Sequence, residues 1–300
     1  MKPSIRLRAF AKINLGLKII GKRPDGYHEI RTVFQTVALH DLLEIAISKH
    51  GTGIVVECDD PSIPAGRGNL VFRACEVWKR AQRFRGEIRA NLVKRIPMGS
   101  GLGGASSDAA TTLLGLERLT GEPMDAAECT ALAAELGSDV PFFLCGGRAL
   151  GIGRGEEIFP LGDLPRRSCL IVFPGFNVST EWAYAEAGRL LPRRLTKREK
   201  VPNIHVLGAR PLFPLKSWGP AENDFEHVVF ARWPELARLK RQLVRAGAET
   251  ASLTGSGSAV YALFNSAQKL ARASEVIPRG WQTFHSRTLS RAEYQRRLML

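Results

Sequence analysis

The sequence lacks a long apolar run, paired cysteine motifs and a recognisable signal peptide. No stretch of about 18 apolar residues occurs in the 300 residues, which excludes a conventional membrane-spanning helix. The five cysteines are scattered, odd in number and free of Cys-x-x-Cys spacing, so we predict reduced thiols rather than disulfides or a cysteine-bound metal. The basic N-terminus has no continuous apolar core or small-residue cleavage site, which excludes a typical secretory signal.

Negative charge is also scarce in this chain. Only 29 Asp and Glu stand against 43 Lys and Arg, which gives a formal net charge of +14. Such a balance can attract nucleic acid, acidic lipid or small polyanions. Basic residues concentrate at 73–95 and 189–200. Neither stretch has the interleaved aromatics of single-strand binders, or a zinc-finger or RRM signature, so we interpret both as solvated basic faces.

The hydrophobic pattern predicts an α+β fold. A hydrophobic content of 44% and a charged content of 24% are globular values, and the length suits one large or two ordinary domains. Paired strands and clustered helices favour α+β over a doubly wound sheet. A composition shift near residues 160–167 suggests domains of residues 1–162 and 163–300.

Alternation and helical spacing predict the individual elements. Strands are predicted at 5–20, 31–39, 42–48, 53–58, 87–96 and 168–175, with 42–48 and 53–58 forming a pair. Helices are predicted at 69–81, 105–119, 124–137 and 234–247, the third capped by Asp125 and stopped by Gly137. Residues 250–264 suggest a strand, a glycine turn and a strand or helix, and a last strand and helix follow in the tail.

Residues 95–116 hold the most unusual stretch, RIPMGSGLGGASSDAATTLLGL, with four glycines between Gly99 and Gly104. Its G-x-G-x-x-G spacing does not indicate a dinucleotide fold, because a second helix follows where a strand is required. No lysine stands where a Walker A loop needs it, and the V-A-I-K, H-R-D and D-F-G motifs of protein kinases are absent. A glycine-rich turn that merely caps the helix is the structural alternative.

Physical chemistry favours a phosphate site in this stretch. Glycines let the backbone curl so that successive N–H groups point inward. The N-terminus of the following helix adds partial positive charge. Ser100, Ser106 and Ser107 offer hydroxyl donors or metal ligands. The stretch therefore predicts a loop that binds phosphates.

The segment PMGSGLGGASSDAA resembles the phosphate loop of the GHMP kinase superfamily. Other segments resemble one family within it, the diphosphocytidyl-methylerythritol kinases, and occur in that family's order. They are FAKINLGLKIIGKRPDGYHEI at 10–30, LGSDVPFFLCGGRALGIGRGE at 136–156, ENDFE at 222–226 and LTGSGSAVYALF at 253–264. The resemblance spans nearly the whole chain, and KRPDGYHEI and SDVPFFL are its family-specific parts.

The resemblance implies a two-domain GHMP kinase fold. An N-terminal ATP-binding domain of the ribosomal-protein-S5 type would precede a ferredoxin-like C-terminal domain, with the active site between them. The implied reaction is ATP-dependent phosphorylation of the 2-hydroxyl of 4-diphosphocytidyl-2-C-methyl-D-erythritol, in non-mevalonate isoprenoid biosynthesis, with Mg²⁺ on the ATP phosphates. Because the first motif begins so near Met1, we expect no transit peptide and a bacterial cytoplasmic enzyme, monomeric or homodimeric.

The resemblance also gives two residues a catalytic role. By pattern alone, Lys12 is a strand lysine and Asp139 a turn residue. By resemblance, Asp139 is the base toward a sugar hydroxyl and Lys12 its electrostatic partner. Ser106 or Ser107 could contact Mg²⁺, but the sequence offers no assignable carboxylate ligand.

Binding residues follow from the same resemblance. For ATP they are Pro97, Gly99, Ser100, Gly101, Leu102, Gly103, Gly104, Ala105, Ser106 and Ser107, with Asn69, Leu70 and Lys94 near adenine. For the cytidyl substrate they are Asn14, Tyr27, His28, Thr180 and Tyr184. His28 would bond to cytosine while Tyr27 and Tyr184 stack on its two faces. Lys94 could instead belong to the basic face.

Two alternatives stay open at this point. Another small-molecule GHMP kinase, of the homoserine or mevalonate type, would have no use for Tyr27, His28 and Tyr184. A basic nucleic-acid-binding protein on a retired kinase scaffold would not need Lys12 and Asp139, yet both are present. We expect small-molecule partners and neither membrane nor nucleic acid, and the excess positive charge has no explanation.

Overall fold

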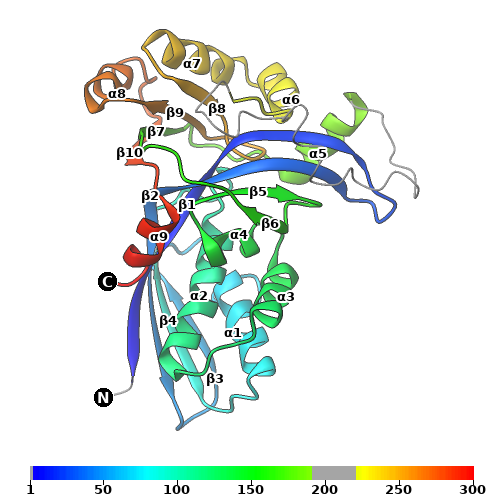
Figure 1. The fold of residues 1–300 in the computed structure, drawn as a ribbon, viewed down its shortest axis with the longest axis vertical. Helices are drawn as coiled ribbons and strands as arrows, with labels where there is room; N and C mark the ends of the chain where they lie inside the picture. Colours follow the sequence, from blue (N-terminus) through cyan, green and yellow to red (C-terminus); the bar gives the residue numbers. More distant parts are fainter. Residues whose placement is uncertain (1–2, 191–220) are drawn as a thin grey trace.

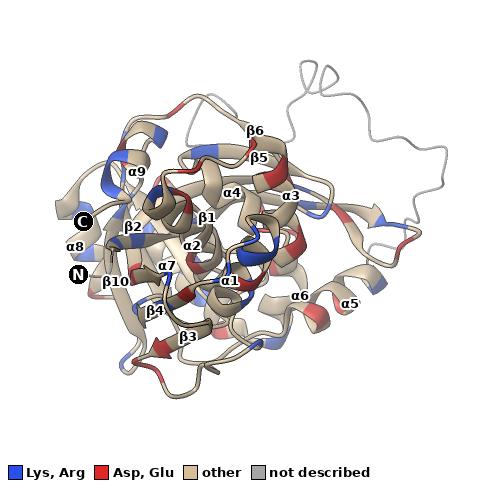
Figure 2. Cartoon of the chain, turned by 90° about the horizontal axis from the view of Figure 1, so that it is seen from below, with Lys and Arg blue, Asp and Glu red and all other residues tan. Residues whose placement is uncertain are grey.

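Two β-sheets organise the chain into two lobes (Figure 1). The computed structural model describes residues 3–190 and 221–300, so the proline- and arginine-rich segment at 191–220 lies outside the described residues. No helix in the described ranges has both the length and the apolar content needed to cross a membrane. Lys and Arg are interspersed with Asp and Glu over many elements (Figure 2).

The first sheet is built on a long hairpin of β1 (Ser4–Lys22) and β2 (His28–Ser48). Its other strands are β3 (Gly53–Cys58), β4 (Glu87–Val93), β5 (Arg148–Ile152) and β6 (Glu157–Pro160), in the order β3-β4-β2-β5-β6. The prediction that residues 42–48 and 53–58 pair directly is wrong, because β4 lies between them. A helix connects β3 to β4, which lets these two strands run parallel.

Helices of the first lobe are α1 (Leu70–Ala81), α2 (Gly104–Thr120), α3 (Ala126–Leu136) and α4 (Val140–Cys145). Asn69 caps α1 and Asp125 caps α3, each accepting backbone N–H groups of the first turn. Helix α2 packs so closely on β1 that a Cβ at Gly115 would lie 2.5 Å from Leu7. Helix α2 packs into a buried core that includes Phe10, Trp78 and Phe142.

The second lobe holds a four-stranded sheet in the order β10-β7-β9-β8. Its strands are β7 (Ser168–Phe173), β8 (Thr250–Leu253), β9 (Val260–Phe264) and β10 (Gln282–Arg287). Its helices are α5 (Thr180–Leu190), α6 (Phe225–Arg232), α7 (Pro234–Arg245) and α8 (Ala267–Ser274). The last helix, α9 (Arg291–Arg297), returns to the first lobe, where the Tyr294 hydroxyl donates to the Phe143 carbonyl (Figure 1).

The lobes share a buried apolar cluster beside the middle of β1. Ala11, Ile13 and Leu102 from the first lobe pack with Ile171 and Tyr261 of the second. Because these side chains are buried, the relative position of the lobes is fixed next to Lys12, which follows Ala11 in the chain.

The basic stretch at 73–95 is partly neutralised by neighbouring carboxylates. Arg80 pairs with Glu135 at 2.7 Å, and Arg89 pairs with Glu87 at 2.7 Å. Both arginine side chains are more than half exposed, which agrees with the interpretation of a solvated face.

Candidate active site

The glycine loop before α2 is shaped by left-handed backbone conformations. Gly99, Gly101 and Gly103 have φ of 61°, 81° and 73°. A Cβ at Gly101 would lie 2.0 Å from the Thr254 carbonyl oxygen, so only glycine fits there. The loop therefore lies directly against the turn between β8 and β9, where the Ala259 N–H donates to the Ser100 carbonyl at 3.1 Å.

A cavity of about 540 Å³ opens between the lobes along this loop. Helix α2 begins at Gly104 without a side-chain cap, and the first bond of its ladder joins the Ser107 N–H to the Gly103 carbonyl. The N–H groups of residues 104–106 therefore have no acceptor within the helix. These three residues line the cavity, so the positive end of the helix faces it. This arrangement suits a phosphate group.

Lys12 and Asp139 meet in the same cavity. The Lys12 Nζ lies 3.2 Å from Asp139 Oδ2 and donates to Asn14 Oδ1 at 2.8 Å. The Lys12 side chain is 4% exposed and the Asp139 side chain 33%, so the ammonium is buried while the carboxylate stays accessible. Asn14 in turn accepts the Gly255 N–H and donates to the Thr32 hydroxyl. Asn14 therefore holds Lys12 in place and links it to the second lobe.

Thr180, predicted to contact substrate, stands at the first position of α5 and lines the cavity. Its Oγ1 lies 3.0 Å from the Ser256 hydroxyl of the β8–β9 turn. This contact joins α5 to the β8–β9 turn, which also contacts the glycine loop, so Thr180 and the loop are held by the same turn.

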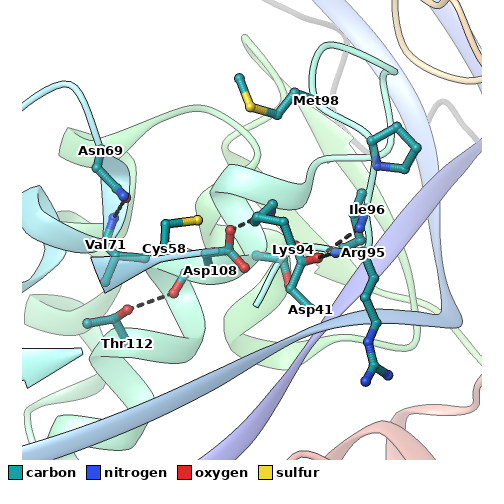
Figure 3. Close-up of polar contacts among 12 residues, drawn as sticks. Asp41, Cys58, Asn69, Val71, Lys94, Arg95, Ile96, Met98, Asp108 and Thr112 are labelled. Carbon is teal, nitrogen blue, oxygen red and sulfur yellow. Dashed lines mark hydrogen bonds and ion pairs between the residues drawn. The ribbon is translucent and has the colours of Figure 1, made fainter. Parts of the chain in front are cut away.

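Lys94 is buried between two carboxylates that sequence reasoning did not connect to it (Figure 3). Its ammonium pairs with Asp41 and, at 2.8 Å, with Asp108 Oδ2. Burial would lower the pKa of Lys94, but the two carboxylates outweigh burial and raise it. Burial, followed by the charge of Asp41, raises the pKa of Asp108. Asp41 also accepts the N–H groups of Arg95 and Ile96, which fixes the chain that leads into the glycine loop.

Asn69 and Leu70, predicted to lie near adenine, line the same cavity as Lys94. The Asn69 Oδ1 accepts the Val71 N–H at 2.8 Å, while its Nδ2 is buried with no hydrogen-bond partner. A buried donor without a partner is costly, so a ligand that accepts from Asn69 would be favoured here.

The three serines of the loop are placed differently. Ser106 lines the cavity at the start of α2. Ser107 does not line it, because its side chain turns inward and donates to the Phe10 carbonyl at 2.7 Å. Ser100 lines the cavity, but its hydroxyl donates to the Pro97 carbonyl at 2.6 Å. The prediction that the Ser107 hydroxyl is available to a metal is therefore wrong in this structure.

The predicted cytosine residues gather where the β1–β2 hairpin meets α5. His28 stacks on Tyr184 with ring centroids 4.9 Å apart and an interplanar angle of 17°. Tyr27 is 55% exposed, and the Arg154 guanidinium lies 4.9 Å from its ring centroid. The ring contacts of Tyr184 among the described residues are with His28 and Phe225, so Tyr27 and Tyr184 do not form the predicted sandwich in this structure. Burial, then Lys22, lowers the pKa of His28 and favours a neutral imidazole.

Comparison with known proteins gives concordant matches. The family models for the GHMP kinases N terminal domain and the GHMP kinases C terminal region match residues 69–147 and 215–282. A 4-diphosphocytidyl-2-C-methyl-D-erythritol kinase of Solibacter usitatus is 45% identical, covering 96% of this chain and 90% of that protein. One of Lachnoclostridium phytofermentans is 37% identical, with coverages of 94% and 97%.

Solved structures agree with the sequence matches. A crystal structure of 4-(cytidine 5'-diphospho)-2C-methyl-D-erythritol kinase superposes with a TM-score of 0.74 at 35% identity, covering 95% of this chain and 99% of that one. A homoserine kinase from Cytophaga hutchinsonii shares the fold at 19% identity, with a TM-score of 0.68 and coverages of 97% and 96%. From its fold, its cavity and these relatives, the chain belongs to the GHMP kinase family.

Proposed function

We propose that this protein transfers the γ-phosphoryl group of ATP to the 2-hydroxyl of 4-diphosphocytidyl-2-C-methyl-D-erythritol, a step of non-mevalonate isoprenoid biosynthesis. One observation carries the proposal: the Lys12–Asp139 pair and the N-terminus of α2 line the same cavity. The acceptor follows from relatives of that name, which match nearly the whole chain at 45% and 37% identity.

The chemistry assigned to the pair is proton transfer and charge neutralisation. Asp139 would accept the proton of the attacking hydroxyl, which increases the nucleophilicity of that oxygen. Lys12 would neutralise charge on the transferred phosphoryl group. Its ammonium is held 3.2 Å from the Asp139 carboxylate, where the acceptor hydroxyl would meet that group. The glycine loop and the first turn of α2 would hold the ATP phosphates so that the terminal one faces the hydroxyl.

Mg²⁺ would enter this site with the nucleotide. Within the described residues, no group of three or more His, Cys, Asp or Glu could hold a metal ion. Mg²⁺ in kinases usually keeps several waters and binds substrate phosphates together with one or two protein ligands. The lack of such a group among these residues is therefore compatible with Mg²⁺ bound to ATP. Ser106, which lines the cavity at the start of α2, is the candidate protein ligand.

Tyr184→Ala is expected to raise KM for the cytidyl substrate about 5–100-fold while KM for ATP changes little. The reason is the loss of one aromatic face for the base, since base–aromatic stacking contributes about 1–3 kcal/mol. Tyr184→Phe keeps the ring and is expected to behave nearly as the native protein. Steady-state kinetics with each substrate varied in turn measure both effects. A larger effect on ATP than on the cytidyl substrate would show that the base pocket is misplaced.

A panel of acceptors tests the proposed function directly. ADP formation should be measured in a coupled assay with the cytidyl substrate, mevalonate and homoserine, each at several concentrations. Turnover on mevalonate or homoserine, with none on the cytidyl substrate, would refute the proposed acceptor. The structural neighbours of these types, at 19% identity or less, share the fold alone. Salt-sensitive nucleic-acid binding without any ATP turnover would instead favour the retired-scaffold alternative.

A further inference from the structure

The turn between β5 and β6 carries an arginine into the acceptor side of the cavity. Arg154 lines the cavity and stands between Gly153 and Gly155, whose φ values are 72° and 106°. The Arg154 N–H and Nε both donate to the Glu156 carboxylate, at 2.6 and 3.1 Å. The Ile30 N–H donates to the Gly153 carbonyl at 2.7 Å, which ties the turn to β2. The arginine is therefore held at its base by fixed backbone.

The two terminal nitrogens of Arg154 are available for a ligand. Glu156 engages only the Nε of the guanidinium, and no hydrogen bond or ion pair joins either Nη to another described residue. Within residues 3–190 and 221–300, Lys12 and Lys94 also line the cavity and are ion-paired, as Arg154 is, but the pair of Arg154 with Glu156 uses Nε alone. Lys12 pairs with Asp139, and Lys94 pairs with Asp41 and Asp108.

Arg154 also lies between the two ends of the proposed acceptor. On one side its guanidinium stacks on the ring of Tyr27, at the predicted base site. On the other, the next residue, Gly155, approaches the catalytic carboxylate, since a Cβ placed there would lie 4.0 Å from Asp139 Oδ1. In the proposed acceptor, a diphosphate separates the cytidine from the hydroxyl that reacts. A cation at this midpoint is therefore matched to the negative charge of that diphosphate.

We propose that Arg154 binds the diphosphate of the acceptor and so distinguishes a nucleoside diphosphate conjugate from an uncharged one. The inference rests on the proposed function and adds a residue to it. Arginine suits this role because its planar guanidinium can donate two parallel hydrogen bonds to phosphate oxygens and stays charged at every physiological pH. Glu156 orients the guanidinium through Nε and leaves the Nη pair for the ligand.

Arg154→Met is expected to weaken CDP binding about 10–100-fold, as is usual for loss of a charge-assisted contact, and cytidine binding less than 3-fold. CDP and cytidine should each be titrated as competitive inhibitors of the native protein and the variant. KM for the cytidyl substrate should rise by a similar factor, with kcat at saturation and KM for ATP nearly unchanged. Arg154→Lys should restore part of the preference for CDP over cytidine.

Arg89→Met, which removes an exposed arginine of β4, is the matched control and should leave both inhibition constants unchanged. Three results would overturn the assignment. An equal loss of CDP and cytidine would mean that Arg154 only supports Tyr27. A rise in KM for ATP alone would place the guanidinium on the nucleotide donor. An unchanged preference for CDP would place the diphosphate elsewhere. If the native protein neither binds CDP nor uses the cytidyl substrate, the proposed function itself fails.

Discussion

Asp139→Asn is expected to lower turnover about 10²–10⁴-fold and to leave ATP affinity nearly unchanged. Asparagine preserves the size of the side chain, and its carbonyl oxygen can still accept a hydrogen bond from Lys12. It cannot take a proton from the acceptor hydroxyl. Asn14 keeps its own bond to Lys12 in the variant, so the buried ammonium retains a partner. Steady-state rates at saturating substrates and a calorimetric titration with an ATP analogue measure the two quantities.

Asp125→Asn is the matched control for this change of charge. Asp125 caps α3 by accepting the N–H groups of Ala127 and Glu128, and asparagine is an equally good cap. The control should therefore keep native turnover and stability. Near-native turnover of Asp139→Asn would remove Asp139 from the role of base, whereas loss of ATP affinity would point to a disturbed cavity.

Elements whose signals are local could be predicted from the sequence. The helix predicted at 124–137 corresponds to α3, because Asp125 and Gly137 act on the adjacent backbone. The glycine loop could be predicted because its left-handed backbone conformations favour glycine whatever the rest of the fold. The long strand at the N-terminus was evident from alternation and corresponds to β1.

Features that depend on distant partners could not be predicted in this way. Helix α4 has only six residues, too few for a clear period, and strands β5 and β6 are short as well. The insertion of β4 between β2 and β3 joins segments far apart in the chain, and no local pattern in β2 or β3 indicates it. The return of α9 to the first lobe likewise rests on contacts made across the whole chain.

The candidate site shows the same division between residues with a local sequence signal and residues that depend on distant partners. Lys12, Asp139 and most of the loop were assigned to the site by their resemblance to family motifs, and they line the cavity. The partners of Lys94 were missed, because Asp41 and Asp108 lie 53 and 14 residues away and no short pattern joins them. Arg154 lies within the segment 136–156, yet only the fold shows that it lines the cavity and stacks on Tyr27.

Lys94→Met is expected to reduce the free energy of unfolding by about 3–5 kcal/mol, the usual cost of removing one partner from a buried ion pair. The side chains of Lys94, Asp41 and Asp108 are 8%, 0% and 3% exposed, so water cannot replace the ammonium. Methionine fills a similar volume without charge. A urea titration of both proteins measures the difference, and Arg89→Met, which breaks an exposed pair on β4, should change the free energy of unfolding little.

The pH dependence of that loss separates an electrostatic cause from a packing defect. Burial and Asp41 already raise the pKa of Asp108 in the folded protein, and removal of Lys94 should raise it further. A carboxyl whose folded pKa lies above its unfolded value stabilises the fold at low pH and loses that contribution as pH rises. Because the pKa of Asp108 in the native protein is already raised to about 8, the difference between native protein and Lys94→Met should be larger at pH 9.5 than at pH 6. A difference that is constant across this range would mean that methionine merely packs badly, and that the charge of Lys94 is not what holds Asp41 and Asp108 together beneath the glycine loop.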